Sequence, residues 1–536
     1  MTLRNTNLTR KTSVALATLP AWLVLIPVAV VLYRAWQPAE AGWDGIIEHR
    51  LGGHIGHTIL LIISVAGLAT LFGVPAAWCI GTRDFAGRRL LEWMLLLPLT
   101  MPGFIAATAY VDALQHLTPF YIKVRELFGV DAFLKVQELV PWLFAILVLS
   151  ATLFPYVYLS CRAVFCRQAS SLLEASRLLG ASPLRTFVTI ALPLARPAIA
   201  AGAVLVAMET VNDVGVVGYF GLSPLTPGIF RAWSEGQPVA AMRLATVLML
   251  IVLSVLMLEK WQRGRARYAL DGAEVPLTRR RSTASGTLLA WLVCGVPLTL
   301  GFLLPGARLL RWAWLSLDKE LDWSAIVRAL WHSTSVAFCT SLFVVAGALS
   351  ILAARRLFPS AFTATAQRLG SLGYAFPSAL IAVGLGVWIA TISQWPGLAS
   401  LALSASVFGL VMACCIRFLA VGIQPLSAGF EQVPTDLKDA ARTLGTRPFT
   451  AFRLIELPLV RPAMIAAATL VFIDTFKELT LTLVLRPFDY ETLATLVYRF
   501  TDEGRIPEAA LPALVMVGCS LIGLIPLNHL LRRASA

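Results

Sequence analysis

Twelve apolar stretches, most of them longer than 20 residues, limit the folds that this sequence can adopt. A helix needs ~20 apolar residues to cross the hydrocarbon core of a bilayer, and continuous apolar runs favour helices over the alternating strands of a barrel. Of the 536 residues, 58% are hydrophobic and only 14% are charged. We therefore predict an all-α polytopic membrane protein with about twelve transmembrane helices, near residues 13–35, 57–80, 92–114, 141–165, 198–221, 241–262, 285–308, 331–354, 369–393, 400–423, 462–485 and 509–530.

Basic residues collect at the ends of alternate spans, for example at Arg88 and Arg89, at Arg355 and Arg356, and near the end of the chain. By the positive-inside rule, these loops and both termini are expected on the cytoplasmic side of a bacterial inner membrane. Loops such as 36–56 then face outward. The first span is too long for a signal peptide core, so we expect it to remain. The net charge of +14 is thus explained by membrane topology, with lipid and not nucleic acid as the expected partner.

An internal repeat determines the predicted architecture. Residues 174–198 and 439–463 are identical at thirteen of twenty-five positions, without a gap, at an offset of 265. Upstream segments correspond at an offset of 275, including Met101-Pro102-Gly103 and Phe376-Pro377-Ser378. We therefore expect two parallel six-helix repeats. The predicted divisions are a first helix and outer loop (1–50), a first transmembrane domain (51–262), a cytoplasmic linker (263–283), a second first helix with its loop (284–325) and a second transmembrane domain (326–530).

The repeated segment is polar enough to lie outside the membrane, and its residues predict two short helices at an angle. Ser171 and Glu174 have the spacing of a capping box, and Gly180 suits the left-handed position that ends a helix. Ser182 and Pro183 can then begin the next helix as its cap and first residue. The second copy has Arg447 in place of the serine, so that helix start is less well specified.

These residues resemble the EAA loop of ABC importer permeases, whose pattern is E-A-A, three residues, G, nine residues and I-x-L-P. The departures are serine at position 176 and aspartate at position 439. The resemblance implies a type I ABC importer permease fold in which each loop docks on one of two ATPase subunits. The implied coupling residues are Glu174, Ala175, Ser176, Gly180, Pro183, Leu192 and Pro193 in the first loop, and Asp439, Ala440, Ala441, Gly445, Pro448, Leu457 and Pro458 in the second.

The chain itself contains no G-x-x-x-x-G-K-[ST] phosphate loop, so we expect a transport subunit and not an enzyme, with ATP and Mg²⁺ on the partner and no cofactor of its own. The eight cysteines form no Cys-x-x-Cys pair and no cluster with histidine at zinc spacing. His57 and His332, at matching places near span starts, are interpreted as interfacial. No fixed metal site is expected.

Two pairs of acidic residues lie inside the spans that follow the loops. Glu209 and Asp213 align at the offset of 265 with Asp474 and Glu478, and each pair has the i, i+4 spacing of one helix face. A charge at mid-bilayer costs about 3 kcal/mol on insertion scales, so such residues usually face a cavity or a partner. One interpretation is a translocation path lined by four carboxylates, which favours a hard cation with oxygen ligands. The other is an internal polar clasp that uses Lys477.

A second resemblance concerns the substrate. Residues 208–215, 228–233, 477–479, 485–488 and 492–495 resemble fused permeases of ferric iron importers, and the likeness extends over nearly the whole chain. It implies a periplasmic iron-binding protein that docks on outer loops such as the charged segment 486–508. Permeases for thiamine and phosphonates share the layout and remain alternatives. A secondary transporter of the major facilitator type also has twelve spans in two parallel halves, although the repeated loop argues against it.

Overall fold

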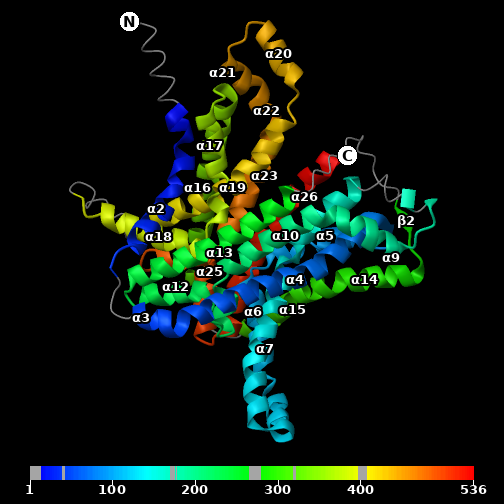
Figure 1. Cartoon of the computed structure of the whole chain (residues 1–536), viewed down its shortest axis with the longest axis vertical. Coiled ribbons are helices and arrows are strands. Elements are labelled where there is room, and N and C mark those ends of the chain that lie inside the picture. The colour runs from blue at the N-terminus through cyan, green and yellow to red at the C-terminus, as the bar shows by residue number, and fades with distance from the viewer. Residues whose placement is uncertain are drawn as a thin grey trace.

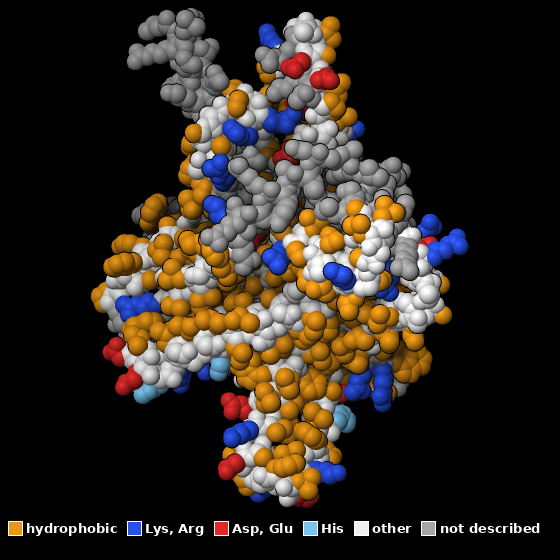
Figure 2. Space-filling model, turned by 45° about the vertical axis from the view of Figure 1, so that its right-hand side comes forward, with side chains coloured by type: hydrophobic (Ala, Val, Ile, Leu, Met, Phe, Trp, Pro, Cys, Tyr) orange, Lys and Arg blue, Asp and Glu red, His pale blue; other side chains and the backbone are white. Residues whose placement is uncertain are grey.

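The computed structural model describes residues 14–38, 43–168, 175–176, 178–264, 279–317, 322–395 and 407–535. Within them, eight helices are long and apolar enough to cross a membrane, or up to twelve if each of four bent helix pairs is one span. α20 (Thr435–Thr443) lies at one end of the long axis, and the first part of α7 (Thr118–Ala163) projects at the other (Figure 1). Hydrophobic side chains cover much of the middle of the face in Figure 2, as expected for a surface against lipid.

The two halves contain corresponding elements in the same order, with a similar division of long, broken and short helices. The first half contains α2 (Leu25–Ala35), α3 (Trp43–Ile46), α4 (Gly52–Thr82), β1 (Arg83–Asp84), α5 (Arg88–Met94), α6 (Gly103–Gln115), α7, α9 (Pro183–Thr186), α10 (Leu192–Asn212), α11 (Gly215–Tyr219), α12 (Leu225–Ser234) and α13 (Pro238–Gly264). The second half contains β2 (Arg280–Arg281), α14 (Ala284–Leu298), α15 (Leu304–Ser316), α16 (Trp323–Leu357), α17 (Ala361–Gly370), α18 (Ser378–Ile392), α19 (Val407–Glu431), α20, α21 (Pro448–Ala451), α22 (Leu457–Leu459), α23 (Arg461–Phe476), α24 (Thr480–Leu485), α25 (Leu493–Asp502) and α26 (Ile506–Ser535).

The predicted spans 92–114 and 369–393 are not straight helices. The chain bends by 87° between Arg88–Thr100 and Gly103–Leu114, and by 109° between Ala361–Ala375 and Ser378–Ile392. Pro102 and Pro377 lie at the two bends, where a proline has no N–H to continue a helix and keeps the residue before it extended. The two spans therefore break at the aligned segments Met101-Pro102-Gly103 and Phe376-Pro377-Ser378.

The predicted spans 198–221 and 462–485 are also interrupted. α10 ends at Asn212 and α23 ends at Phe476, and short helices α11 and α24 follow after two or three residues. The expectation that each acidic pair shares one helix face is therefore wrong, because Asp213 has an extended backbone and terminates its helix. The chain turns between the first and second acid of each pair.

Two segments that the sequence analysis treated as outer loops contain helices. Segment 36–56 includes α3, a π-helical turn and the start of α4, and segment 486–508 includes α25, whose inner face is buried. The two threonines that start α25 exchange side-chain and backbone hydrogen bonds as a capping box, which explains a helix in so charged a segment. α7 is longer than its predicted span and breaks at Gly129, where φ is +85°.

The first helix of each half packs against the other half. α2 packs on α18 of the second half, and α14 and α15 pack on α4 and α6 of the first half. Gly301, in the π-helical turn before α15, lies so close to the carbonyl of Ala151 that no side chain would fit. β1 pairs in parallel with β2, which places residues 280–281 beside the first half, whereas most of the predicted linker, residues 265–278, lies outside the described residues.

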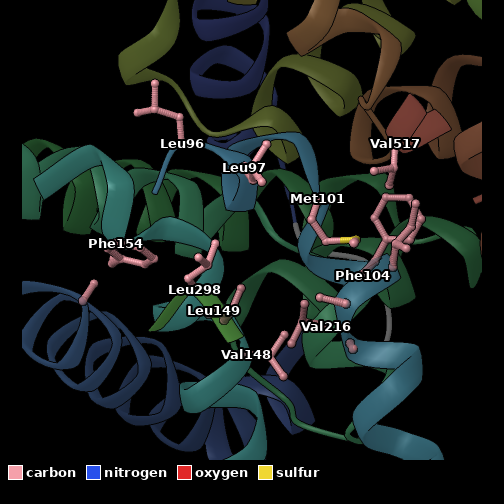
Figure 3. Packing of buried hydrophobic residues seen from close by; sticks show 14 of the residues in the cluster. Leu96, Leu97, Met101, Phe104, Val148, Leu149, Phe154, Val216, Leu298 and Val517 are labelled. Atoms are coloured by element: carbon pink, nitrogen blue, oxygen red, sulfur yellow. The ribbon is translucent and has the colours of Figure 1, made fainter. Parts of the chain in front are cut away.

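The larger of the two apolar cores forms around the first broken span. Figure 3 shows Met101 and Phe104 against Leu149 of α7 and Val216 of α11, with Val517 of α26 nearby. The bend in this span and the end of α10 are therefore packed against buried side chains from both halves. The broken helices are held in place, and they surround the site described next.

Candidate functional site

Loop 1 (residues 174–193) has the glycine turn and the second helix start that its sequence predicts. Gly180 has a φ of +75°, the left-handed conformation that a helix end requires. The backbone N–H of Arg185 donates to the Ser182 side chain at 3.3 Å, and Pro183 occupies the first turn of α9. Ser176 is buried and its Oγ lies 3.1 Å from the hydroxyl of Thr186 in α9, so the chain before Gly180 is linked to the helix after it. Glu174 and the predicted capping box lie outside the described residues.

Loop 2 (residues 439–458) repeats this geometry with a weaker helix start. Gly445 also has a φ of +75°, and Pro448 begins α21. The side chain of Arg447 makes no capping hydrogen bond, which confirms that this start is less well specified. Asp439 and Ala440 are exposed on α20, whereas Ala441 is buried. Leu192-Pro193 and Leu457-Pro458 each begin the helix that follows a π-helical turn.

Each loop also presents apolar side chains that the sequence analysis did not single out. Leu179 and Leu184 are 87% and 73% exposed, and their counterparts at the offset of 265, Leu444 and Phe449, are 84% and 65% exposed. Large apolar side chains at matching exposed places typically mark a protein contact. The gapless alignment of the two loops contained this signal, because both positions keep an apolar residue.

The four acidic residues line one cavity of about 100 Å³. It is formed by the ends of α10 and α23, the two bends, the last third of α7 and the middle of α19, so both halves contribute. The acids converge because the chain turns after α10 and α23, and not because of helical periodicity. We refer to it as the acid cavity; its charged and polar lining comprises Thr152, Tyr156, Glu209, Asn212, Asp213, Tyr374, Arg417, Asp474, Lys477, Glu478 and Thr480.

The second acid of each pair caps the short helix that follows it. Asp213 Oδ1 accepts from the backbone N–H of Val216 at 2.7 Å, and Glu478 Oε1 accepts from that of Leu481 at 3.0 Å. These carboxylates thus satisfy free N–H groups at the starts of α11 and α24. The remaining oxygen of Asp213 points toward Gly103, where a Cβ would lie only 2.8 Å from it. A glycine at the start of α6 gives this carboxylate room.

The first acid of each pair contacts groups from other elements. Glu209 accepts a hydrogen bond from the hydroxyl of Tyr374, which lies at the bend of the second half. The Arg417 guanidinium, on α19, lies 3.7 Å from Glu209 and 3.3 Å from Glu478. Arg417 is only 4% exposed, so its charge is balanced by these two carboxylates and not by water.

The lysine that the clasp interpretation invoked does pair locally. Lys477 Nζ lies 2.9 Å from Asp474 Oδ1 and 3.5 Å from the carbonyl oxygen of Leu99 in the first half. At the equivalent place in the first half, the Asn212 side chain accepts from the backbone N–H of Ser378 at 2.8 Å. Both positions therefore connect the end of one half's helix to the bend of the other half.

Four carboxylates and two cations leave the acid cavity with a formal charge of −2 when all six groups are ionised. Such a lining can replace part of the hydration shell of a hard cation with carboxylate, hydroxyl and carbonyl oxygens. Among the described residues, no group of three or more His, Cys, Asp or Glu side chains is placed to hold a metal ion. Neither Arg417 nor Tyr374 was predicted from the sequence as a site residue; a lone arginine inside an apolar span was the available signal for the first.

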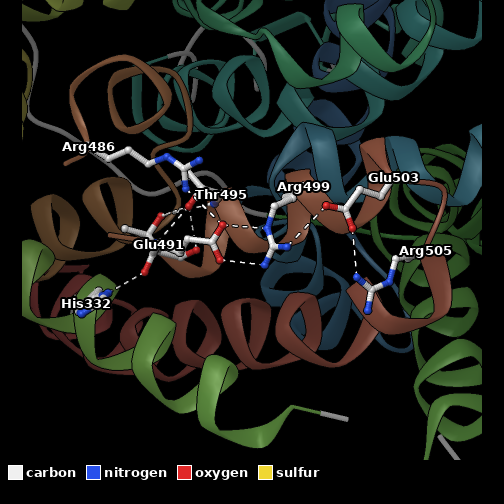
Figure 4. Close-up of polar contacts among 8 residues, drawn as sticks. His332, Arg486, Glu491, Thr495, Arg499, Glu503 and Arg505 are labelled. Carbon is white, nitrogen blue, oxygen red and sulfur yellow. Dashed lines mark hydrogen bonds and ion pairs between the residues drawn. The ribbon is translucent and has the colours of Figure 1, made fainter. Parts of the chain in front are cut away.

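A second charged cluster lies on α25 and its flanks. Glu491 receives two hydrogen bonds from Arg499, at 2.8 and 3.0 Å, and one from Arg486 at 3.4 Å, and Glu503 links Arg499 to Arg505 (Figure 4). This cluster borders a cavity of about 870 Å³, with Phe488 exposed at its edge. Most of the charges proposed for partner docking are thus paired with one another.

The two histidines lie in packed surroundings. His332 stacks on Tyr490 at 4.0 Å between ring centres, and its Nδ1 lies 2.9 Å from the Glu491 carbonyl oxygen. His57 packs edge-on against Trp142. Within the described residues neither histidine belongs to a metal-binding cluster.

A family model described as "binding-protein-dependent transport system inner membrane component" matches the chain twice, over residues 69–258 and 346–535. Over 522 residues the chain is 28% identical to the Fe(3+)-transport system permease protein FbpB 2 of Haemophilus influenzae, covering 93% of this chain and 96% of that protein.

Shorter relatives match about two fifths of the chain. A protein of Salmonella paratyphi A, described as a 2-aminoethylphosphonate transport system permease protein PhnV, is 28% identical over 208 residues, which is 38% of this chain and 75% of that protein. The molybdate/tungstate transport system permease protein WtpB of Pyrococcus abyssi is 27% identical over 214 residues, 39% of this chain and 78% of that protein.

Proposed function

Because this chain belongs to the family of binding-protein-dependent transport system inner membrane components, and is thus a transport permease and not an enzyme, we propose that it provides the translocation path of an importer for ferric iron. The two family matches correspond to the two predicted repeats of a type I ABC permease, and they remove the major facilitator alternative. The acid cavity supports this substrate assignment, because four carboxylates line one space: those of Glu209, Asp213, Asp474 and Glu478.

The excess of acidic groups supports a cationic substrate. A carboxylate-rich cavity with a formal charge of −2 stabilises a hard trivalent cation and repels an oxyanion. The full-length relative is named for Fe(3+) transport, which agrees with this chemistry. A phosphonate remains the second candidate, since the shorter relatives include a permease named for 2-aminoethylphosphonate, and Arg417 and Lys477 supply two cations. The acid cavity gives thiamine no particular support.

Energy for transport is proposed to come from two copies of a separate ATPase, one on loop 1 and one on loop 2. Two observations support this arrangement: the loops share the left-handed glycine, and both expose apolar side chains at matching positions. ATP and Mg²⁺ would bind to the partner. The outer partner is proposed to be a periplasmic iron-binding protein, the membrane is the bacterial inner membrane, and both termini are placed in the cytoplasm by the positive-inside rule.

The test is uptake of radioactive ferric iron by membrane vesicles that contain the chain, its ATPase and its binding protein. We expect uptake to require ATP, to resist competition by excess 2-aminoethylphosphonate, and to fall strongly in the double variant Glu209→Gln, Asp474→Asn while ATPase association is retained. Asp112→Asn, a carboxylate that pairs with Arg308 at 2.8 Å outside both the acid cavity and segment 486–508, is the matched control. Normal iron uptake by the double variant, or ATP-dependent uptake of the phosphonate and not of iron, would refute this substrate assignment.

A further inference from the structure

A second cavity lies directly beside the acid cavity and shares part of its wall. It has a volume of about 270 Å³ and is mostly apolar, with Leu96, Leu159, Leu205, Val421 and Leu470 in its lining. The residues that line both cavities are Leu99, Tyr156, Tyr374, Asp474 and Lys477. This shared set forms the partition between the two spaces.

The chain direction shows on which side of the partition the second cavity lies. α10 and α23 both run from their loops toward the acid cavity. Leu205 precedes Glu209 by about one helical turn, and Leu470 precedes Asp474 by the same distance, so both leucines are nearer the loops. The second cavity therefore lies between the acid cavity and loops 1 and 2, and we refer to it as the loop-side cavity.

The partition is closed by contacts between the halves. The Tyr374 hydroxyl, from the bend of the second half, donates to Glu209 at the end of α10 in the first half. Lys477, in the second half, reaches the Leu99 carbonyl at the bend of the first half at 3.5 Å. The two halves must separate at these contacts before a hydrated ion can move from one cavity to the other.

We propose that the hydrogen bond from Tyr374 to Glu209, which we call the latch, keeps the two cavities of the translocation path apart. A cation that binds Glu209 competes with the Tyr374 hydroxyl for this carboxylate and opens the latch; this role of the cation rests on the proposed function. Glu209 Oε1 accepts from Tyr374 and also faces Arg417 at 3.7 Å, so this oxygen is already engaged when the cavity is empty. A cation that binds Glu209 through this oxygen must displace at least one of the two groups.

This competition makes opening of the partition depend on the bound cation, because the same carboxylate binds the cation and holds the partition closed. A ligand shifts an equilibrium only by its difference in affinity for the two states. A cation held by Glu209 binds better when the tyrosine has moved away, so it favours the open state. An empty cavity favours the closed state, because the hydrogen bond to the charged carboxylate is then available.

The test measures whether a reagent from outside can reach the loop-side cavity. Leu470→Cys places a thiol in that cavity, and a membrane-impermeant maleimide is added either to spheroplasts or to inverted vesicles. Labelling is read as the increase over the same protein without the reporter. In the otherwise native chain we expect labelling from the inverted vesicles and little from the spheroplasts.

Tyr374→Phe keeps the ring and removes only the hydroxyl. A hydrogen bond to a charged acceptor favours the closed state by roughly tenfold or more, so labelling from the outer side should rise by about that factor. Glu209→Ala should act in the same way, whereas Glu209→Gln keeps an acceptor for the tyrosine and should stay nearer the native level. Tyr110→Phe removes a buried hydroxyl that donates to the Leu300 carbonyl at 2.6 Å, away from both cavities, and should change nothing.

Outer labelling that is unchanged in Tyr374→Phe and Glu209→Ala would overturn the latch. Equal labelling in Glu209→Gln and Glu209→Ala would also contradict it, because the acceptor would then be irrelevant. These measurements contain no iron, so they can fail or succeed independently of the proposed substrate. A final arm adds ferric citrate to the native chain; an increase in outer labelling that Glu209→Gln abolishes is the expected sign of competition, and no increase would refute it.

Discussion

Replacing Arg417 with methionine should destabilise this protein far more than removing a typical surface charge. With an effective dielectric constant of about 20, the attractions of Arg417 to Glu478 at 3.3 Å and to Glu209 at 3.7 Å amount to about 5 and 4.5 kcal/mol before desolvation is counted. Desolvation of the buried Arg417 and Glu478, and of the partly buried Glu209, offsets much of this sum. What remains after Arg417→Met is one buried and one partly buried carboxylate without their cation, and an unpaired buried charge typically costs ~3–5 kcal/mol.

A second substitution tests whether the cost arises from the unpaired carboxylates. Glu478→Gln keeps an oxygen for the backbone N–H of Leu481 but removes the charge. Added to Arg417→Met, it should restore roughly half of the lost free energy of unfolding, about 2 kcal/mol. A purely steric effect of Arg417→Met would leave the double variant as unstable as the single one.

The assay is unfolding of the purified protein in mixed micelles by titration with a denaturing detergent, followed by circular dichroism. Arg308→Met is the control, because Arg308 pairs with Asp112 at 2.8 Å but its side chain is 31% exposed. That pair should contribute about 1 kcal/mol or less. The reasoning fails if Arg417→Met costs no more than Arg308→Met, or if Glu478→Gln brings no recovery in the Arg417→Met background.

Three further predictions concern the loops and a helix start. Replacing Gly180 and Gly445 with valine, at a φ of +75°, should weaken ATPase association in a pull-down while membrane insertion stays normal; unchanged association would show that the loops do not couple. Ser182→Ala should lower the local stability of loop 1 by ~1 kcal/mol, and Arg447→Ser should raise that of loop 2 by a similar amount, measured by hydrogen exchange; no change in either would contradict the capping argument. Hydrogen bonds from Ser324 and Ala325 lower the pKa of the Asp322 carboxyl below its usual 3.8. The ionised carboxylate therefore stabilises the folded protein above that pH, and this stabilisation is lost as the pH falls through the pKa of the folded state. The difference in melting temperature between the native protein and Asp322→Asn should shrink from pH 7 to pH 3, and a constant difference would contradict this prediction.

Much of the architecture follows from patterns that persist along the sequence. The repeat at an offset of 265 determined the two halves, and the glycine and proline positions correctly predicted the turns of both loops. The bends at Pro102 and Pro377 were missed because both lie inside apolar runs, where hydropathy alone does not distinguish a straight helix from a broken one. The aligned prolines carried the information, since proline cannot continue the hydrogen-bond ladder of a helix.

The acids of the candidate site were recognisable from sequence, but their surroundings were not. Glu209 and Asp474 stand out as charges in apolar spans. Their assembly into one cavity depends on the ends of α10 and α23 meeting the two bends, which is a property of packing between segments far apart in the chain. The contact between Tyr374 and Glu209 joins residues 165 positions apart, so no local pattern could have predicted it.

The fusion of two unequal halves sets the formal charge of the acid cavity, because both of its cations come from one half. At the offset of 265, Arg417 and Lys477 correspond to Thr152 and Asn212, so both cations come from the second half. A dimer of the first half alone would place four carboxylates in the cavity with no cation, and a dimer of the second half would place four cations against four carboxylates. Only the fused chain reaches an intermediate formal charge of −2, because each substitution occurs once. The cavity can thereby attract a cation while two of its carboxylates share a guanidinium, which keeps the site paired when it is empty.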